Sequence, residues 1–391
     1  MKRGETGRYE STSVGGEQVR AFVPAALPPV PRLVLEGPLQ PLLESAVLAV
    51  GRLDGASALF PDKTLFLYSC VRKEAVLSSQ IEGTQSSLSD LLLFELDEAP
   101  GVPLDDVVEV SNYVAAMDHG LARLREGFPL SNRLIREIHA ALLSKGRGSG
   151  KTPGEFRSSQ NWIGGSRPGN AVFVPPPHHA VEDCMGALER FLHADADGLP
   201  VLVRAGLAHV QFETIHPFLD GNGRVGRLLI TLLLCHSGVL REPLLYLSLH
   251  FKQHRATYYD LLERVRHDGD WEEWLLFFLE GIRATADSAS SSAQRLGAMF
   301  QRDRSRIEPL GRRAGSALRV HDALKARPIL SLVAISERTN LSFPAASAGM
   351  EVLVEEGVAR ELTGKRRNRI FVYDGYLAIL NEGIELQSRS Q

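Results

Sequence analysis

The sequence is poor in cysteine, with only Cys70, Cys184 and Cys235 in 391 residues. These cysteines lie far apart among apolar neighbours and form no Cys-x-x-Cys or Cys/His group. The pattern therefore indicates neither a disulfide framework nor a zinc site. We expect packed thiols in a reducing compartment.

Long apolar runs and a strong net charge are also absent. No uninterrupted apolar run approaches the ~20 residues that a membrane-spanning helix needs, and residues 1–31 do not resemble a signal peptide. The net charge of -3 gives no general attraction to nucleic acid or to an anionic membrane. We expect a cytoplasmic protein of two or three domains without membrane contact, in which any basic surface is local.

Hydrophobic periodicity predicts a mainly α-helical chain. Residues 1–32 are rich in Gly, Ser and Pro and are expected to form an extended arm. Helical spacing begins near Leu39 and again at Lys63, and the second of these helices is expected to stop at Gly83. The segment Phe156–Pro177 predicts a β-hairpin, because turn residues occupy its middle. Further helices are predicted at Ser87–Leu96, Leu104–Glu126, Ser131–Leu143, Ala180–His193, Leu199–Thr214, Arg224–Ser237, Phe251–Arg266 and Trp271–Thr285.

The C-terminal part has a different pattern. The serine-rich run Ser288–Ser292 predicts a loosening of the chain before a linker helix. Beyond about Arg313, a helix, a second helix and a two-stranded ribbon are predicted, which is the order of a winged helix-turn-helix. We therefore expect an N-terminal helical region at 33–100, a catalytic core at 101–286, a linker helix at 287–314 and the winged helix-turn-helix at 315–391.

The segment His216–Arg227, HPFLDGNGRVGR, carries the strongest chemical signal. Gly221, Asn222 and Gly223 tolerate positive φ, so successive backbone N–H groups can turn toward one point and form an anion nest. The apolar helix Leu228–Cys235 follows, and its N-terminus adds a positive dipole end at the same place. The pattern predicts a polyphosphate site.

Charged side chains complete this predicted site. Arg224 and Arg227 are three residues apart on one helix face, and both can reach the anion. Asp220 precedes the nest and can hold Mg²⁺ through its carboxylate. His216 lies outside the nest and is a candidate general base. Together these residues predict phosphoryl-type transfer.

The segment resembles the Fic motif, HPFx[D/E]GNGRxxR, and every specified position is filled. The resemblance extends over roughly residues 33–284, and it implies a protein adenylyltransferase that moves AMP from ATP to a Tyr, Ser or Thr hydroxyl. It also implies that His216 is the base, that Asp220 binds Mg²⁺, and that the chain can form a homodimer. The residues implied in phosphate binding are Gly221, Asn222, Gly223, Arg224, Val225, Gly226 and Arg227.

Two outlying segments agree with the resemblance. NAVFVPPP at Asn170–Pro177 resembles the family's flap, which covers the nucleotide and pairs with the target chain by strand addition. Its expected contact residues are Asn170, Ala171, Val172 and Phe173. Tyr258 and Tyr259 resemble a tyrosine pair whose first member lies by the adenosine. An ordinary surface hairpin and a buried aromatic pair remain open as plainer interpretations.

Residues 78–83, SSQIEG, resemble the family's inhibitory motif [S/T]xxxE[G/N]. Ser78 and Glu82 share one helix face, and Gly83 ends the helix. A carboxylate at the negative end of a helix dipole favours a cationic partner, and the resemblance implies that this partner is Arg227. Pairing would remove an arginine from the terminal phosphate of ATP. The alternative is an exposed glutamate at a helix end.

Two other function classes stay open. One is a different reaction at the same site: phosphorylation, transfer of another nucleotide, or removal of AMP from a modified protein. The other is a DNA-binding regulator. The expected recognition helix Phe343–Glu356 has no Lys or Arg, whereas base reading usually uses such residues. A basic cluster in the wing could touch phosphates, so any DNA binding is expected to be weak. This cluster contains Lys365, Arg366, Arg367 and Arg369.

Overall fold

The structure is a computed structural model, and it describes residues 2–56, 63–96, 102–194, 198–365 and 367–384. It is mainly helical, as predicted. The two central helices are α7 (Val201–Ile215) and α8 (Asn222–His236), and almost every residue of both is buried. A helix that is apolar on all sides belongs in a core, so the loop between α7 and α8 is held from both ends. That loop contains the predicted phosphate site.

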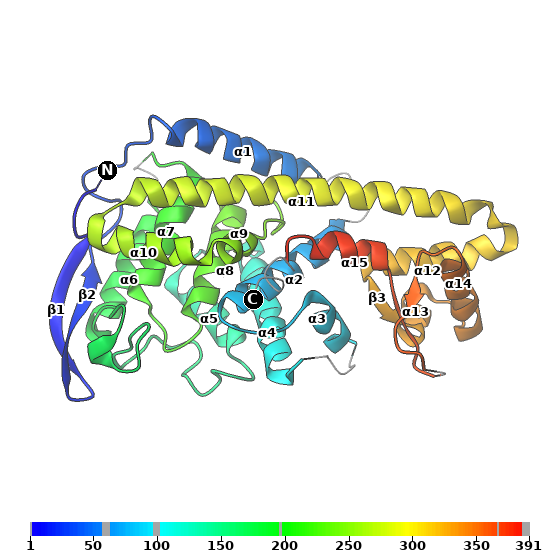
Figure 1. The fold of residues 1–391 in the computed structure, drawn as a ribbon, viewed down its shortest axis with the longest axis horizontal. Helices are drawn as coiled ribbons and strands as arrows, with labels where there is room; N and C mark the ends of the chain where they lie inside the picture. Colours follow the sequence, from blue (N-terminus) through cyan, green and yellow to red (C-terminus); the bar gives the residue numbers. More distant parts are fainter. Residues whose placement is uncertain (1, 57–62, 97–101, 195–197, 366, 385–391) are drawn as a thin grey trace.

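A shell of helices surrounds this central pair (Figure 1). Most of their bounds lie within two residues of the prediction. The predicted helix Phe251–Arg266 is an exception, because the chain breaks at His254 into two helices. The shell contains α1 (Leu39–Ala56), α2 (Lys63–Ile81), α3 (Leu88–Phe94), α4 (Leu104–Arg125), α5 (Asn132–Leu142), α6 (Val181–Leu192), α9 (Ser248–Gln253) and α10 (Arg255–Asp268).

Helix α11 (Trp271–Ile307) is 37 residues long and runs beside α1 along the molecule (Figure 1). The predicted loosening at Ser288–Ser292 is wrong, because α11 continues unbroken through it. Ser290 and Ser292 are buried, and tertiary packing outweighs the modest helix propensity of serine. Among the described residues, none of the helices combines the length and apolar character needed to cross a bilayer.

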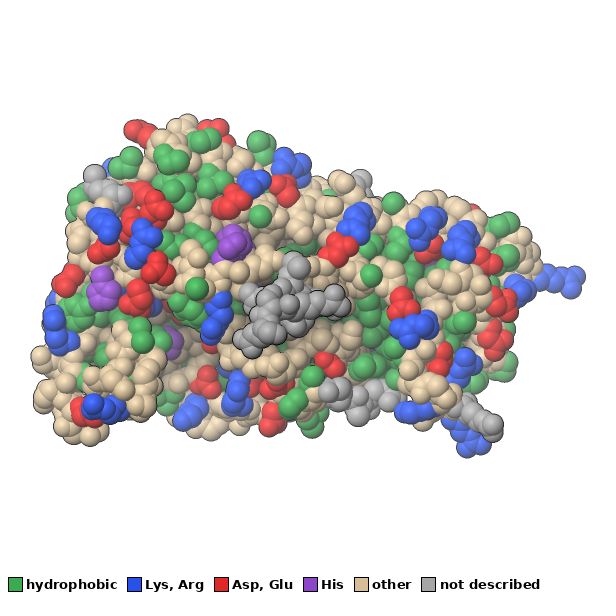
Figure 2. All heavy atoms as spheres, in the orientation of Figure 1, with side chains coloured by type: hydrophobic (Ala, Val, Ile, Leu, Met, Phe, Trp, Pro, Cys, Tyr) green, Lys and Arg blue, Asp and Glu red, His purple; other side chains and the backbone are tan. Residues whose placement is uncertain are grey.

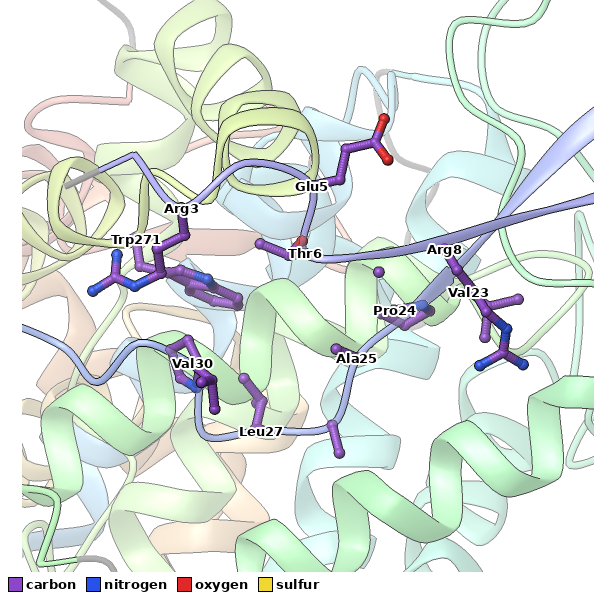
Figure 3. A pocket seen from close by; sticks show the side chains of 13 residues that line it. Arg3, Glu5, Thr6, Arg8, Val23, Pro24, Ala25, Leu27, Val30 and Trp271 are labelled. Carbon is purple, nitrogen blue, oxygen red and sulfur yellow. The ribbon is translucent and has the colours of Figure 1, made fainter.

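The N-terminal arm folds back on itself, which the sequence analysis did not predict. Strands β1 (Gly7–Val14) and β2 (Glu17–Pro24) pair antiparallel in the register Gly7↔Pro24 to Val14↔Glu17. Gly15 and Gly16 both have positive φ at the turn, as a two-residue hairpin loop requires. Arg3 joins the base of this hairpin to α11 by pairing with Glu272 at 2.5 Å, beside a hollow that Trp271 also lines (Figure 3).

After α11, the chain forms a small module that contains the two predicted helices and the predicted pair of strands, preceded by a helix and a strand that were not predicted. It begins with the short helix η4 (Glu308–Arg313) and contains α12 (Ala314–Ala326), β3 (Ile329–Ser331), α13 (Leu332–Thr339), α14 (Phe343–Glu355), β4 (Arg360–Glu361) and β5 (Ile370–Val372). The three strands form an antiparallel sheet in the order β3-β5-β4.

The last helix, α15 (Asp374–Asn381), returns from this module to α2. The buried hydroxyl of Tyr376 lies 2.7 Å from Ser69 Oγ on α2. Lys73 Nζ, also on α2, donates to the carbonyl of Glu382 at 3.1 Å, and Arg295 on α11 pairs with the Glu382 carboxylate. The C-terminal end of the described chain is therefore fastened to the helix that carries the predicted inhibitory motif. On the face of the molecule that Figure 2 shows, acidic and basic side chains are mixed.

Candidate active site

The candidate site begins where α7 ends. His216 has φ 49° and ψ 60°, a left-handed conformation that turns the chain out of the helix. Two residues later, the buried Phe218 ring stacks on His139, with centroids 3.7 Å apart and an interplanar angle of 8°. His139 Nδ1 accepts from the Gly154 N–H at 2.8 Å, so Nε2 is the atom that donates to the Asp220 carbonyl at 3.1 Å. The loop is thus fixed by contacts outside the motif.

The backbone after this loop has N–H groups without helical partners where the anion nest is predicted, although of residues 221–223 only Gly221 has positive φ. Gly221 has φ 77° and precedes α8, and the Val225 N–H donates to the Gly221 carbonyl at 3.0 Å. The N–H groups of Asn222, Gly223 and Arg224 precede that bond, so they cannot be satisfied within the helix. The Asn222 side chain instead holds the loop, with bonds of 2.8 Å to both the N–H and the carbonyl of Phe218.

A cavity of about 260 Å³ opens over this nest. It brings together residues that are far apart in the sequence. Glu82, directly after α2, lies at one side, and Arg147, between α5 and the flap, lies at another. The motif residues form the floor. The lining residues are Glu82, Arg147, His216, Leu219, Asp220, Gly221, Asn222, Gly223 and Arg224. The candidate base, the candidate metal ligand and the candidate inhibitory glutamate therefore share one cavity.

Arg227 pairs with Glu82, as the resemblance implied, and it also bonds Ser78, which was not predicted. Its Nε donates to Ser78 Oγ at 2.9 Å, and its Nη2 donates to the Ser78 carbonyl at 2.9 Å and to Glu82 Oε1 at 2.6 Å. Gly83, with φ 102°, turns the chain away directly afterwards. A side chain at position 223 would clash with Glu82 Oε1, so Gly223 allows the pair to lie directly on the nest.

The pairing changes the titration of both groups. Burial raises the pKa of Glu82, but Arg227, Arg224 and His216 outweigh it, and the pKa lies below its usual value. Burial lowers the pKa of Arg227, and Glu82 and other anionic partners reverse this, so its pKa is raised. The pair is therefore ionised at neutral pH, and Glu82 keeps a full negative charge in the cavity.

Arg224 also has an internal carboxylate partner, which the sequence analysis missed. Glu109 on α4 contacts Arg224 Nη1 at 3.0 Å and Arg147 Nε at 2.7 Å. Glu109 is 1% exposed; an acidic residue among the apolar residues of α4 was the available signal. Arg147 lines the cavity with a half-exposed side chain. It adds a cation to the site that no motif indicated.

Two titratable groups face the reaction centre. Burial, Arg157 and Arg266 lower the pKa of His216 well below its usual value, against the opposing effect of Glu82. The imidazole is therefore neutral at neutral pH and able to accept a proton. Asp220 is 37% exposed, lies 3.6 Å from Arg224, and accepts from the Gly221 N–H at 2.6 Å.

This environment fits the predicted Mg²⁺ ligand. The Asp220 carboxylate lines the cavity beside the nest, and Mg²⁺ usually takes one or two carboxylates together with substrate phosphates and water. No group of three or more His, Cys, Asp or Glu side chains suited to a metal occurs among the described residues. A metal here would depend on the nucleotide for its other ligands.

The predicted hairpin at 156–177 is less regular than expected. It contains one β-bridge, Ile163↔Phe173, and the short helix η2 (Pro168–Asn170) at its tip. Asn170 Oδ1 accepts from the N–H groups of Ser166 and Arg167 at 3.0 and 2.9 Å, which folds the tip into a turn rather than a strand ladder. A second short helix, η3 (His178–Ala180), follows the segment.

The flap residues divide into an exposed part and an anchored part. Val172 is 68% exposed and Ala171 is partly exposed, whereas Phe173 is buried between Phe22 of β2 and the Arg266 guanidinium, which lies 3.9 Å from its ring centroid. The Phe22 N–H donates to the Val174 carbonyl at 2.9 Å. The N-terminal hairpin thus braces the flap.

Tyr258 does not line the cavity. Its ring is 1% exposed and packs with Phe251 and Trp274. Its hydroxyl lies 2.9 Å from His209 Nε2, and His209 Nδ1 lies 3.1 Å from the Gly226 carbonyl. The tyrosine therefore supports the α8 backbone through His209. Val225, also on α8, is buried as well.

Comparisons with known proteins agree with this geometry. Residues 40–122 match the N-terminal region of the Fic/DOC family, and residues 129–234 match the Fic/DOC family. Most of the segment 40–234 is thus similar to the Fic/DOC family. The chain is 33% identical over 212 residues to the protein adenylyltransferase Fic of Culex quinquefasciatus. The alignment covers 53% of this chain and 39% of that relative. The corresponding protein of Drosophila ananassae is 30% identical over 188 residues, or 48% of this chain and 35% of the relative.

Solved structures show the same fold. A Fic family protein from Desulfovibrio desulfuricans aligns with a TM-score of 0.55 and 19% identity, over 85% of this chain and 96% of that one. A Fic domain containing signaling protein from Bacteroides thetaiotaomicron aligns with a TM-score of 0.52 and 20% identity, over 64% of this chain and 95% of that one. Only the Fic fold follows from these two similarities.

Proposed function

We propose that this chain transfers AMP from ATP to a hydroxyl of a target protein, and that Glu82 inhibits the transfer. The carrying observation is the single cavity that holds His216, Asp220, the nest and Glu82. The curated relatives named protein adenylyltransferase support the choice of reaction. The chain spans 39% of the Culex quinquefasciatus relative's length, so target and substrate are part of the proposal.

In the proposed reaction, the target hydroxyl oxygen attacks the α-phosphorus of ATP. The bond from that phosphorus to the bridging oxygen of the β-phosphate breaks, pyrophosphate leaves, and the hydroxyl proton passes to His216. The nest N–H groups at 222–224 and the freed Arg227 bind the phosphate oxygens. Mg²⁺, when bound at Asp220, neutralises phosphate charge. The exposed flap edge at Ala171 and Val172 is where an extended target segment would pair.

The inhibition follows from the charge that Glu82 brings into the cavity. While the pair is formed, Arg227 donates to Glu82 and Ser78 instead of to a terminal phosphate. The carboxylate also repels the phosphate from that position. ATP can therefore bind only in a pose displaced from the one that transfer needs.

Removal of AMP is the second candidate reaction at this site. It is favoured by one observation: Glu82, held by Arg227, lies inside the cavity that holds His216. A carboxylate there can orient and deprotonate water for attack on an AMP-modified side chain. The same glutamate would then oppose transfer and promote its reversal.

The C-terminal module has less support as a DNA reader. We infer a winged helix from its element order. At the end of α14, however, Glu355 pairs with Arg313 at 2.5 Å and Glu356 pairs with Arg306 at 3.2 Å, so these two carboxylates are engaged within the chain. Any DNA contact would come from wing residues such as Lys365 and Arg369, and it would be weak and salt-dependent. The homodimer also stays a prediction.

Labelled ATP distinguishes these reactions. With Mg²⁺ and a cell lysate, ATP labelled at the α-phosphate should mark protein, while ATP labelled at the γ-phosphate should not. Label from the γ-position alone would instead establish phosphorylation. Loss of label from a pre-modified protein, dependent on Glu82, would establish the reverse reaction.

A further inference from the structure

Arg157 is a buried arginine with no carboxylate partner among the residues that the structure describes. It is 2% exposed, and all the acceptors of its guanidinium are backbone carbonyls. Nε donates to His216 at 2.9 Å, Nη1 to Ser159 at 3.2 Å, and Nη2 to Pro176 at 2.5 Å and to Ile215 at 3.5 Å. Burying a charge without a counterion is costly unless its hydrogen bonds are satisfied. The planar, forked donor set of arginine satisfies them here.

Two of these acceptors belong to the catalytic turn. The carbonyls of Ile215 and His216 lie at the C-terminal end of α7, where carbonyl groups lack partners within the helix. The left-handed conformation of His216 is unfavourable for a residue other than glycine. Arg157 bonds both carbonyls and so holds the turn from which the imidazole enters the cavity.

The other two acceptors belong to the flap segment. Ser159 lies near the start of the 156–177 segment that carries the flap, and Pro176 lies near its end, so one guanidinium joins the two ends of this segment. Nearby bonds reinforce the junction: the Arg157 N–H donates to the Pro217 carbonyl at 2.9 Å, and Gln160 Nε2 donates to the Pro175 carbonyl at 2.8 Å. The same side chain therefore bonds both the segment that carries the flap and the turn that carries His216.

We propose that Arg157 is a positioning residue that sets the placement of the flap, where a target segment docks, relative to the imidazole of His216. The inference rests on the proposed AMP transfer. A transferred hydroxyl must lie within hydrogen-bond reach of the base, and a misplacement of about 1 Å can cost ~10²-fold in rate.

The charge of Arg157 has a second effect on the base. The groups that bear on the imidazole after burial are Arg157, Arg266, Glu82 and the backbone of Glu213. The two arginines disfavour the protonated imidazole, whereas Glu82 favours it. Arg157 therefore adds to burial in disfavouring the protonated imidazole, besides holding the turn that carries it.

Two substitutions separate these effects. Arg157→Lys keeps the positive charge but loses the forked donors, while Arg157→Met loses both. Each is made in a Glu82→Gly parent, so that self-modification with ATP and Mg²⁺ is measurable. Gln160→Ala is the control: it loosens one end of the flap and leaves the His216 carbonyl bonded.

We expect both Arg157 variants to lose about 10- to 100-fold in kcat for self-modification, with an unchanged KM for ATP. The pKa of His216, followed by NMR and assigned with His216→Ala, should rise in Arg157→Met and stay in Arg157→Lys. Gln160→Ala should slow self-modification without moving that pKa. Thermal unfolding and nucleotide binding show that each variant is folded.

The positioning role is overturned if both Arg157 variants match the parent, or if they weaken ATP binding as much as they slow transfer. An unchanged His216 pKa in folded Arg157→Met would overturn the electrostatic part. A parent that transfers no AMP would contradict the proposed function instead, and the NMR titration would still decide the coupling of Arg157 to His216.

Discussion

The carboxylate of Glu82 lies 2.6 Å from Arg227 Nη2, across 145 positions of sequence. Arg224 has a comparable partner in Glu109, so both arginines of the motif are paired internally. The two pairs differ in exposure: Glu109 is 1% exposed and Glu82 is 33% exposed. Glu82 lines the cavity, so in the proposed reaction it is the carboxylate that a terminal phosphate would meet and displace.

His216→Ala should abolish transfer and leave ATP binding intact. In the proposed site, the backbone N–H groups and the arginines bind the phosphates, and the imidazole is not among those donors. Loss of a positioned general base costs typically 10²–10⁴-fold in rate. Transfer is measured with ATP labelled at the α-phosphate, and binding with a fluorescent nucleotide. A variant that transfers at the parental rate would remove His216 from the mechanism.

Asp220→Ala should weaken Mg²⁺-dependent nucleotide binding and lower the transfer rate. The Asp220 carboxylate lines the cavity beside the nest and is the group expected to hold the divalent cation. Titration of nucleotide with and without Mg²⁺ checks this, with EDTA-treated wild type as the reference. If both activity and binding ignored EDTA and the substitution, Asp220 would have only a structural role.

The fully buried Glu74 should make stability depend on pH. It accepts from the Ser248 N–H at 3.1 Å and from Ser248 Oγ at 2.5 Å. Burial raises its pKa from 4.5 to about 7. A raised pKa means that the folded protein prefers the protonated group. The stability that the protonated carboxyl contributes is fully present at pH values below its unfolded-state pKa. It is lost as the pH rises through the folded-state pKa of about 7.

Glu74→Gln replaces this group by one that does not titrate. Between pH 4.5 and 7, the wild type should lose unfolding free energy relative to the variant, as measured by melting temperatures across that range. Other carboxylates contribute equally to both proteins, so the difference isolates Glu74. Parallel curves for the two proteins would show that the carboxyl titrates normally.

Tyr376→Phe should destabilise the attachment of α15 to α2. The substitution leaves the buried Ser69 Oγ without the partner that lies 2.7 Å away, and an orphaned buried hydroxyl costs about 1–3 kcal/mol. The double variant with Ser69→Ala removes both groups and should recover part of the loss. Denaturant unfolding measures the cycle, and additive effects would contradict a direct bond.

The central helices and the motif loop could be predicted because their signals are local. The run from His216 to Arg227 contains its own glycines, arginines and helix start. Glu82 was likewise matched to Arg227 through the short motif that resembles the family's, and the structure forms that pair. Apolar periodicity placed α4 and α8 nearly to the residue for the same reason.

Contacts between distant segments could not be predicted in this way. Glu109, Arg147 and Arg157 act through partners that only the fold brings near, and none belongs to a recognisable motif. The unbroken α11 was missed because burial of Ser290 and Ser292 outweighs their local propensity. The N-terminal hairpin was missed because its two strands have little apolar alternation before Val19.

Glu82→Gly tests the account most directly, because it should increase activity. Removing the carboxylate frees Arg227 for the terminal phosphate and deletes a repulsive charge. Charge-assisted contacts are worth roughly 1.5–3 kcal/mol each, so transfer should rise about tenfold or more. Glu82→Asp should fall between the two, and Glu82→Gly with His216→Ala should be inactive.

The measurement is the rate of AMP incorporation by intact mass, with wild type and Glu82→Gly at equal nucleotide occupancy. Faster incorporation by Glu82→Gly, abolished by His216→Ala, is the predicted result. Equal rates for wild type and Glu82→Gly, with ATP bound in both, would contradict inhibition by Glu82.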